Sequence, residues 1–217
     1  MRAELSVVPP SALADAARAR LRALSPRRLV LAGGSTPRAL YEALTVEDLA
    51  WTTIDVFFSD ERCVPPDHPD SNVGMARRAL LDRVPARVHA MDGTRCDETG
   101  YEADLAAVFG DGRPTEFDVA LLGLGEDGHT ASLFPGDPAL LERRRLVARV
   151  ERPDHARLTL TPPALQAARV ALFLVAGVRK REPLRRWLAG EDLPAALIRA
   201  ARVEVIADAE AARGIDA

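Results

Sequence analysis

Apolar and polar residues follow one another along this chain in blocks that predict β-strands separated by α-helices. Short continuous apolar runs are typical of strands buried on both faces of a parallel sheet. Longer stretches with apolar residues three or four positions apart are typical of helices. The strands expected are 4–8, 28–32, 54–58, 87–91, a run beginning at Phe117, 170–176 and 202–206. The helices expected are 11–24, 37–44, 71–81, 99–109, 161–168 and 182–188, with a short terminal helix opening at Asp208.

The alternation of strands and helices predicts an α/β fold with a mostly parallel sheet flanked by helices on both faces, which is a Rossmann-like arrangement. One exception is the pair 145–152 and 156–161, where apolar and polar residues alternate on either side of Pro153-Asp154. That pattern predicts an antiparallel hairpin. No repeat or linker divides the 217 residues, so we expect a single domain over 1–217.

The composition excludes several classes of protein. The net charge is −3, from 29 basic and 32 acidic residues, so no overall field attracts nucleic acid. No apolar run approaches the length of a membrane span, and the N-terminal residues lack the apolar core of a signal peptide. Cys63 and Cys96 lie far apart and indicate neither a disulfide framework nor a zinc site. We therefore expect a cytoplasmic protein that spans no membrane.

Four of the expected strands end in clusters of glycine, hydroxyl and charged residues. The carboxyl ends of parallel strands open on one edge of a sheet, where ligands bind in α/β folds, so the four clusters predict one active-site cleft. The second cluster lies after strand 54–58, and the fourth contains Lys180, the only lysine in the chain. The clusters are Gly33–Pro37, Ser59–Arg62, Gly123–Ser132 and Gly177–Lys180.

The spacing of the residues excludes several familiar catalytic and ligand-binding motifs. Gly33-Gly34-Ser35-Thr36 is followed by Pro37, so it does not complete the Gly-x-Ser-x-Gly turn of serine hydrolases. The chain lacks a Gly-x-Gly-x-x-Gly after the first strand and a Gly-Lys-Ser/Thr motif. The four histidines are scattered and no helical pair has zinc-ligand spacing, so no metal or cofactor is expected. General acid–base catalysis with His129 as the base remains.

Three of these motifs together resemble the 6-phosphogluconolactonase family and its relatives, the glucosamine-6-phosphate isomerases. The motifs are Gly33–Pro37, Ser59–Arg62 followed by Asp70-Ser71-Asn72, and Gly123–Pro135. The resemblance extends from the first helix to Asp208. It implies a small-molecule substrate, 6-phospho-D-glucono-1,5-lactone, which the protein would hydrolyse to 6-phosphogluconate without a metal or cofactor.

Position 134 separates the two branches of the family. The isomerases carry Asn-Glu-Pro after the motif Asp-Gly-His, and that Glu supports ring opening of the sugar. This chain has Phe134 before Pro135, and phenylalanine cannot relay a proton. An aminosugar-phosphate isomerase is therefore disfavoured, and a lactonase, which opens no sugar ring by this relay, fits.

The roles of the remaining residues follow from the residue types and the resemblance. His129 would take a proton from the attacking water, since the ordinary pKa of imidazole, about 6.5, lies near working pH. Asp127 either orients the imidazole or water, or satisfies loop N–H groups. The substrate phosphate would bind Gly34, Ser35 and Thr36, and the resemblance adds Arg157 and Lys180 as counter-charges. Arg62 either pairs with its acidic neighbours or reaches substrate oxygens, and Asp60 has a binding or structural role.

Two further expectations concern partners and an alternative function. We expect a monomer whose partner is the sugar-phosphate lactone, with no nucleic acid and no membrane. A non-catalytic sugar-phosphate sensor on the same scaffold would keep the phosphate loop and both cations but could dispense with His129 and Asp127. This chain retains both residues.

Overall fold

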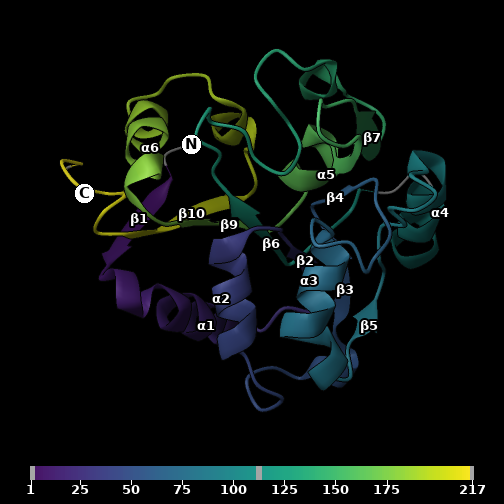
Figure 1. Cartoon of the computed structure of the whole chain (residues 1–217). Helices are drawn as coiled ribbons and strands as arrows, with labels where there is room; N and C mark the ends of the chain where they lie inside the picture. The colour runs from purple at the N-terminus through teal and green to yellow at the C-terminus, as the bar shows by residue number, and fades with distance from the viewer. Residues whose placement is uncertain (1–2, 111–113, 216–217) are drawn as a thin grey trace.

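A seven-stranded sheet in which all neighbouring strands are parallel forms the centre of the protein (Figure 1). The computed structural model describes residues 3–110 and 114–215, so the two ends of the expected domain lie outside the described residues. In spatial order the strands are β1 (Glu4–Val8), β10 (Arg202–Asp208), β9 (Val170–Val175), β6 (Val119–Gly123), β2 (Arg28–Leu31), β3 (Asp55–Phe58) and β5 (Arg87–Val88).

Helices cover both faces of this sheet, as the sequence pattern predicts. Figure 1 shows α1, α2 and α3 on one side and α5 and α6 on the other. The helices are α1 (Leu13–Leu24), α2 (Ser35–Ala43), α3 (Asn72–Ala79), α4 (Glu98–Phe109), α5 (Pro162–Gln166) and α6 (Arg181–Leu188). None of the described helices is long and apolar enough to cross a membrane.

The central strands are buried because their side chains are apolar on both faces. All six residues of β9 are buried, as are the first four of β6. Tyr41 of α2 is fully buried, and its hydroxyl accepts from the Ala32 N–H at 2.9 Å and donates to the Ala32 carbonyl at 2.8 Å. These bonds hold α2 beside the end of β2, where the first polar cluster begins.

A small antiparallel sheet lies beside the carboxyl ends of the parallel strands. Its strands are β4 (Asp60–Arg62), β8 (Arg157–Leu160) and β7 (Val147–Val150), in that spatial order. The predicted hairpin is confirmed as β7 and β8. The third strand was not predicted, because β4 is entirely polar and gains its pairing only from β8.

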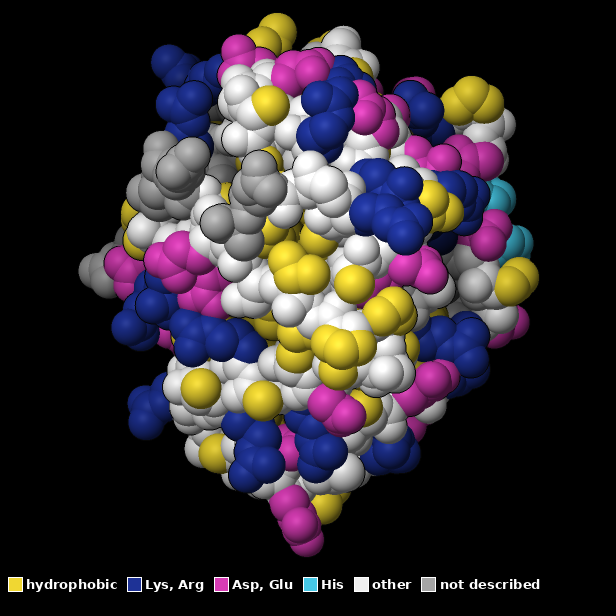
Figure 2. All heavy atoms as spheres, turned by 90° about the vertical axis from the view of Figure 1, so that its left-hand side faces the viewer, with side chains coloured by type: hydrophobic (Ala, Val, Ile, Leu, Met, Phe, Trp, Pro, Cys, Tyr) yellow, Lys and Arg dark blue, Asp and Glu magenta, His cyan; other side chains and the backbone are white. Residues whose placement is uncertain are grey.

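The edge strand β1 lies on the face shown in Figure 2, where hydrophobic side chains gather in the middle and charged ones surround them. Val7 of β1 is 43% exposed. On the opposite edge the structure is less regular than predicted, since β5 has two residues and not the five of 87–91. Whether the protein is a monomer stays a prediction.

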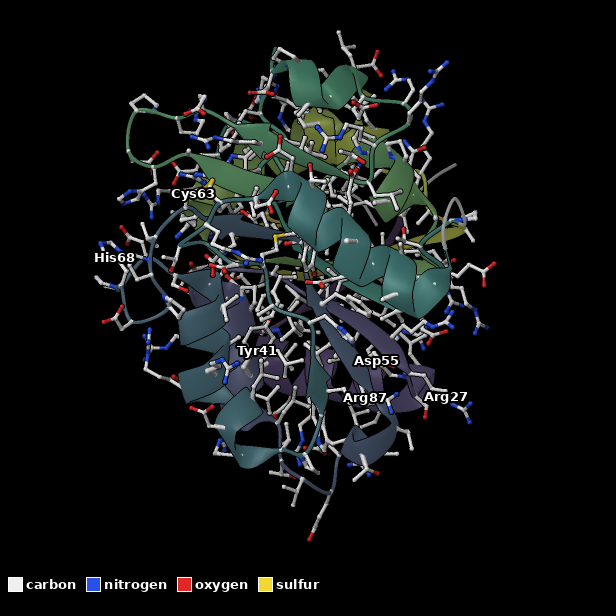
Figure 3. The ribbon with its side chains drawn as sticks, turned by 90° about the vertical axis from the view of Figure 1, so that its right-hand side faces the viewer. Arg27, Tyr41, Asp55, Cys63, His68 and Arg87 are labelled. Carbon is white, nitrogen blue, oxygen red and sulfur yellow. A yellow bond between two sulfur atoms is a disulfide. The ribbon has the colours of Figure 1, made fainter. Side chains whose placement is uncertain are left out.

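Two predictions about the chain are wrong. Cys63 and Cys96 form a disulfide with their Cα atoms 5.2 Å apart, whereas the sequence indicated unpaired cysteines (Figure 3). The approach depends on Gly93, because a Cβ there would overlap the carbonyl oxygens of Arg62 and Val64. Their pairing is a tertiary contact between residues 33 positions apart, which spacing did not reveal.

The expected terminal helix at Asp208 is also wrong, for the described residues up to 215. Asp208 is the last residue of β10, and turns follow it. Its carboxylate accepts the N–H groups of Gly177 at 2.8 Å and Ala211 at 2.7 Å, which ties the strand end to the turn before α6. Gly214 then has a φ of 80°, a conformation that interrupts a helix.

Candidate active site

The candidate site is a cleft at the point where the strand order reverses direction. From β2 the chain continues to β3 on one side, while β6 on the other side of β2 pairs with β9. The crevice beyond such a switch point is where open α/β sheets bind ligands. Eight of the nine residues predicted for the site line this cleft: Gly34, Ser35, Thr36, Asp60, Arg62, His129, Arg157 and Lys180. The ninth, Asp127, is not a lining residue but contacts the Nδ1 atom of the His129 imidazole.

The first wall of the cleft is the loop between β2 and α2. Gly34 precedes the helix with a φ of 104°, a left-handed conformation that glycine adopts without strain. The first N–H groups of a helix have no partner within it, and among the described residues those of Ser35 and Thr36 donate to no other group, so they could bind an anion. The positive end of the α2 dipole adds to this preference.

His129 and Asp127 form a pair within the loop that follows β6. His129 Nδ1 lies 2.6 Å from Asp127 Oδ1, and the His129 backbone N–H donates to the same oxygen at 3.1 Å. Burial opposes ionisation of Asp127, but the backbone N–H and imidazole of His129 outweigh it and hold the pKa of this carboxyl below its ordinary value. An ionised carboxylate only accepts, so Nδ1 carries the proton and Nε2 keeps a free lone pair.

The shape of this loop depends on the absence of one side chain. A Cβ at Gly125 would overlap the His129 ring, so the imidazole lies directly against the backbone there. On its other side the His129 ring packs against Phe134, with ring centroids 4.4 Å apart. Phe134 is buried, and the Arg152 guanidinium lies 4.0 Å above its ring. The position that carries Glu in the isomerase motif is here an apolar support for the imidazole.

Two arginines face each other on the far wall. Arg62 of β4 and Arg157 of β8 are direct cross-strand partners, an arrangement in which like charges destabilise the sheet. Arg62 Nη1 donates to the Asp70 carbonyl at 2.7 Å, and Arg157 Nη2 donates to Asp154 Oδ2 at 2.7 Å. The Nε atoms of both arginines are buried without a partner among the described residues. An anion in the cleft would relieve this repulsion.

Lys180 completes the positive side of the cleft from the turn before α6. It ends the short 3₁₀ turn Val178–Lys180 and lines the cleft together with the loop Gly33–Pro37. Burial lowers the pKa of its ammonium, and the nearby carboxylates of Glu126 and Asp127 oppose this only partly. A phosphate beside Lys180 would offset the effect of burial, because a nearby negative charge stabilises the charged form of the amine.

Asp60, by contrast, is fixed by the protein. The side chain is buried, and its two oxygens accept hydroxyl bonds from Ser59 at 2.9 Å and Ser132 at 2.7 Å. Asp60 thus ties the small sheet to the loop that carries His129. Of the two roles that the sequence left open, this geometry favours the structural one.

Asn72 lines the cleft and was not among the predicted site residues, although it belongs to the motif Asp70-Ser71-Asn72. Its side-chain amide donates to the Asp60 carbonyl at 2.9 Å, and a Cβ at Gly33 would overlap it. The buried carboxylate of Glu61 accepts the Asn72 N–H at 2.7 Å and so holds the start of α3 in place. Burial raises the pKa of Glu61, opposed by these bonds.

Comparison with known proteins places the chain in a family. Residues 3–207 match the family described as glucosamine-6-phosphate isomerases/6-phosphogluconolactonase. The chain is 46% identical over 175 residues to a 6-phosphogluconolactonase of Synechocystis sp., covering 76% of this chain and 73% of the relative. It is 39% identical over 181 residues to that of Mycobacterium tuberculosis, with the same two shares.

Solved structures give the same result. A 6-phosphogluconolactonase from Trypanosoma cruzi superposes with a TM-score of 0.88 at 31% identity, covering all of this chain and 98% of that one. A monomeric glucosamine-6-phosphate deaminase superposes with a TM-score of 0.81 at 23% identity, covering 96% and 98%. At that identity the second match shows only that the two branches share this fold.

Proposed function

Because the chain belongs to the glucosamine-6-phosphate isomerase/6-phosphogluconolactonase family, we propose that it is a carboxylic-ester hydrolase that converts 6-phospho-D-glucono-1,5-lactone to 6-phospho-D-gluconate. The observation that carries this proposal is the pairing of His129 with an ionised Asp127 across the cleft from three cations. The relatives named 6-phosphogluconolactonase support the choice of substrate. Phe134 supports the lactonase branch, since it cannot relay the proton that an isomerase needs.

In the proposed mechanism His129 Nε2 accepts a proton from water as the water oxygen attacks the lactone carbonyl carbon. The resulting imidazolium is stabilised by Asp127, 2.6 Å from Nδ1. The carbonyl oxygen becomes an oxyanion, and we propose backbone N–H groups of the loop 123–131 as its donors. The tetrahedral intermediate then expels the ring oxygen, which takes the proton back from His129. These steps need only proton transfer and charge stabilisation, so they use no metal or cofactor.

The substrate phosphate would bind the free N–H and hydroxyl groups of Gly34, Ser35 and Thr36, with Lys180 and the two arginines as counter-charges. The paired arginines Arg62 and Arg157 are the strongest support for an anionic ligand, because like charges directly opposite each other destabilise a sheet and an anion between them would offset this. All of these groups come from one chain, which supports a monomer as the active form. The net charge of −3 supports a small-molecule partner and no nucleic acid, and we propose a cytoplasmic location.

The test is hydrolysis of freshly generated lactone by the wild type and by His129→Ala, with the spontaneous rate subtracted. Loss of a general base typically lowers the rate about 10²–10⁴-fold. We expect the wild type to exceed the background and the folded variant to lose this excess. A wild type that only matches the background would favour the sugar-phosphate sensor. An equally active variant would keep the function and refute the role of His129.

The isomerase alternative has its own assay. Glucosamine 6-phosphate supplied to the wild type should release no ammonia, because Phe134 stands against His129 where the isomerase motif has Glu. Ammonia release at a rate comparable to lactone hydrolysis would overturn the assignment to the lactonase branch. Glu126→Gln, a change in the same loop away from the His129 ring, serves as the control for both assays.

A further inference from the structure

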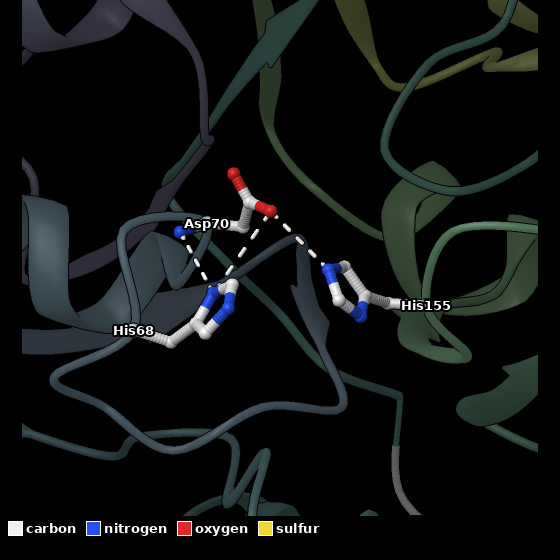
Figure 4. A group of neighbouring side chains, drawn as sticks. All are labelled: His68, Asp70 and His155. Atoms are coloured by element: carbon white, nitrogen blue, oxygen red, sulfur yellow. Dashed lines mark hydrogen bonds and ion pairs between the residues drawn. The ribbon is translucent and has the colours of Figure 1, made fainter.

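A second cluster of polar side chains lies beside the cleft and is not used by the proposed mechanism. It consists of His68 and Asp70, from the loop between β4 and α3, and His155, from the turn between β7 and β8 (Figure 4). His155 Nε2 lies 3.2 Å from Asp70 Oδ2, and His68 Nδ1 lies 3.9 Å from the same oxygen. The three atoms are all within 4.8 Å of one another.

Two of the three side chains are joined by a hydrogen bond, and the separations among all three are also close to those between the ligand atoms of a small cation. Zinc binds imidazole nitrogen and carboxylate oxygen at about 2.0–2.2 Å, so two ligand atoms of a tetrahedral site are about 3.4 Å apart. The two distances of 3.2 and 3.9 Å lie on either side of that value. Small rotations of three partly exposed side chains, which are 30–54% accessible, would therefore close the site around an ion and leave a fourth position for water.

The protonation pattern also suits a metal. His68 Nδ1 accepts the backbone N–H of Asp70 at 3.1 Å, so this nitrogen has no proton, and a zinc ion would replace that N–H as the partner of its lone pair. Among the described residues, the ion pairs of Asp70 are with the two histidines alone, and no arginine or lysine neutralises it. Two imidazoles around a carboxylate that no arginine or lysine pairs with form a ligand set for a divalent cation of the zinc type.

We propose that His68, Asp70 and His155 form a zinc(II) site that fastens the loop after β4 to the hairpin of β7 and β8. Two of its ligands are 85 residues or more from the third, so the ion would link segments that no covalent bond joins there. The proposed link lies next to Arg62 and Arg157, the arginines proposed to bind the substrate phosphate. The Asp70 carbonyl accepts from Arg62, and His155 precedes Arg157 by two positions. The sequence predicted no metal, because the ligands converge only in the fold.

The site is distinct from the catalytic pair and its chemistry differs from that of a hard-cation site. Imidazole favours zinc over magnesium and calcium, which prefer sites built from oxygen ligands. Magnesium and calcium are therefore expected to bind weakly or not at all here. The proposal does not rest on the lactonase reaction, so it can fail while that function stands.

The experiment is titration of the untagged, metal-free protein with zinc by calorimetry, without reductant so that the disulfide stays closed. Cobalt(II) is added in parallel, because its visible absorption reports tetrahedral coordination. We expect one zinc ion per chain, and an affinity about tenfold weaker or worse in His68→Gln and in His155→Gln. Asp67→Asn, a change at an exposed carboxylate of the same loop, and His129→Gln should bind as the wild type does. Circular dichroism checks that each variant is folded.

Each alternative result contradicts the proposal in a recognisable way. Absence of zinc binding to the wild type would show that the cluster is held by hydrogen bonds alone. Equal affinity in the wild type, His68→Gln and His155→Gln would place any bound zinc elsewhere. Loss of binding only in His129→Gln would assign the metal to the pair of His129 and Asp127. Equal affinity for magnesium would contradict the imidazole ligands.

Discussion

Removal of the Asp127 charge is the most informative change to the candidate site, because its effect can be worked from the geometry. In the proposed reaction the His129 imidazole becomes positive in the transition state, beside a carboxylate oxygen 2.6 Å from Nδ1. Unit charges about 4 Å apart interact by about 4 kcal/mol near a protein surface. The side chains are 48% and 31% accessible, so solvent screens most of this.

We therefore expect Asp127→Asn to raise the barrier by about 1–1.5 kcal/mol, which corresponds to a fall in kcat/KM of about 5- to 12-fold. The loss should appear in kcat, because the charge pair forms only in the transition state. The assay is acid release from fresh lactone, measured with a pH indicator after subtraction of the spontaneous rate. Glu126→Gln removes the neighbouring charge of the same loop, which pairs with Arg179, and should leave kcat unchanged.

Two results would refute this reasoning. Wild-type kcat in Asp127→Asn would mean that the carboxylate serves only the loop N–H groups. An equal fall in Glu126→Gln would mean that the general negative charge of the loop matters and that the contact with His129 does not.

Three further predictions concern the frame around the site. Reduction of the disulfide between Cys63 and Cys96 should lower the free energy of unfolding by about 3–4 kcal/mol, as expected for the 33-residue separation of the cysteines. Urea denaturation with and without reductant measures this loss. The control is the variant with both cysteines changed to alanine, whose stability should not respond to reductant. Gly125→Ala should displace the His129 ring and remove hydrolysis while the fold persists. Gly123→Ala, where a Cβ meets nothing within 4 Å, should leave the imidazole NMR signals in place. Unchanged signals in both variants would contradict the close approach of the His129 ring to the Gly125 backbone. The Arg20 guanidinium lowers the pKa of Glu204, so the stability from this pair is present above the ordinary pKa of 4.5 and is lost as the pH falls through the folded pKa. In acid unfolding, Glu204→Gln should start from a lower free energy of unfolding and lose less of it as the pH falls. A free energy of unfolding that falls with pH in parallel to that of the wild type would argue against the pair.

Much of the fold could be predicted because the buried strands are apolar in the sequence itself. The runs that became β2, β3 and β9 are continuous and short, and turn residues follow each of them. The placement of polar clusters after these strands also predicted the edge at which a cleft would open. The roles assigned to the individual residues remain proposals, although the structure brings eight of them around one cleft.

The remaining features depend on contacts between segments that the sequence pattern does not connect. Strand β4 has three polar residues and is a strand only because β8 pairs with it. The disulfide requires the close approach at Gly93, and the contact between His68 and Asp70 on one segment and His155 on another requires the small sheet to be in place. Each of these is a tertiary effect that local propensity does not encode.

The division of the cleft between the two sheets has a mechanical consequence. The loop Gly33–Pro37 and His129 follow strands of the large parallel sheet, whereas Arg62 and Arg157 belong to the small antiparallel one. A phosphorylated ligand that contacts both sets would act as a further non-covalent cross-link between two sheets that Ser59 and Asp60 already connect. The product, which keeps the phosphate and gains a carboxylate, would strengthen that cross-link, so thermal stabilisation by 6-phosphogluconate would report how firmly the two layers are joined.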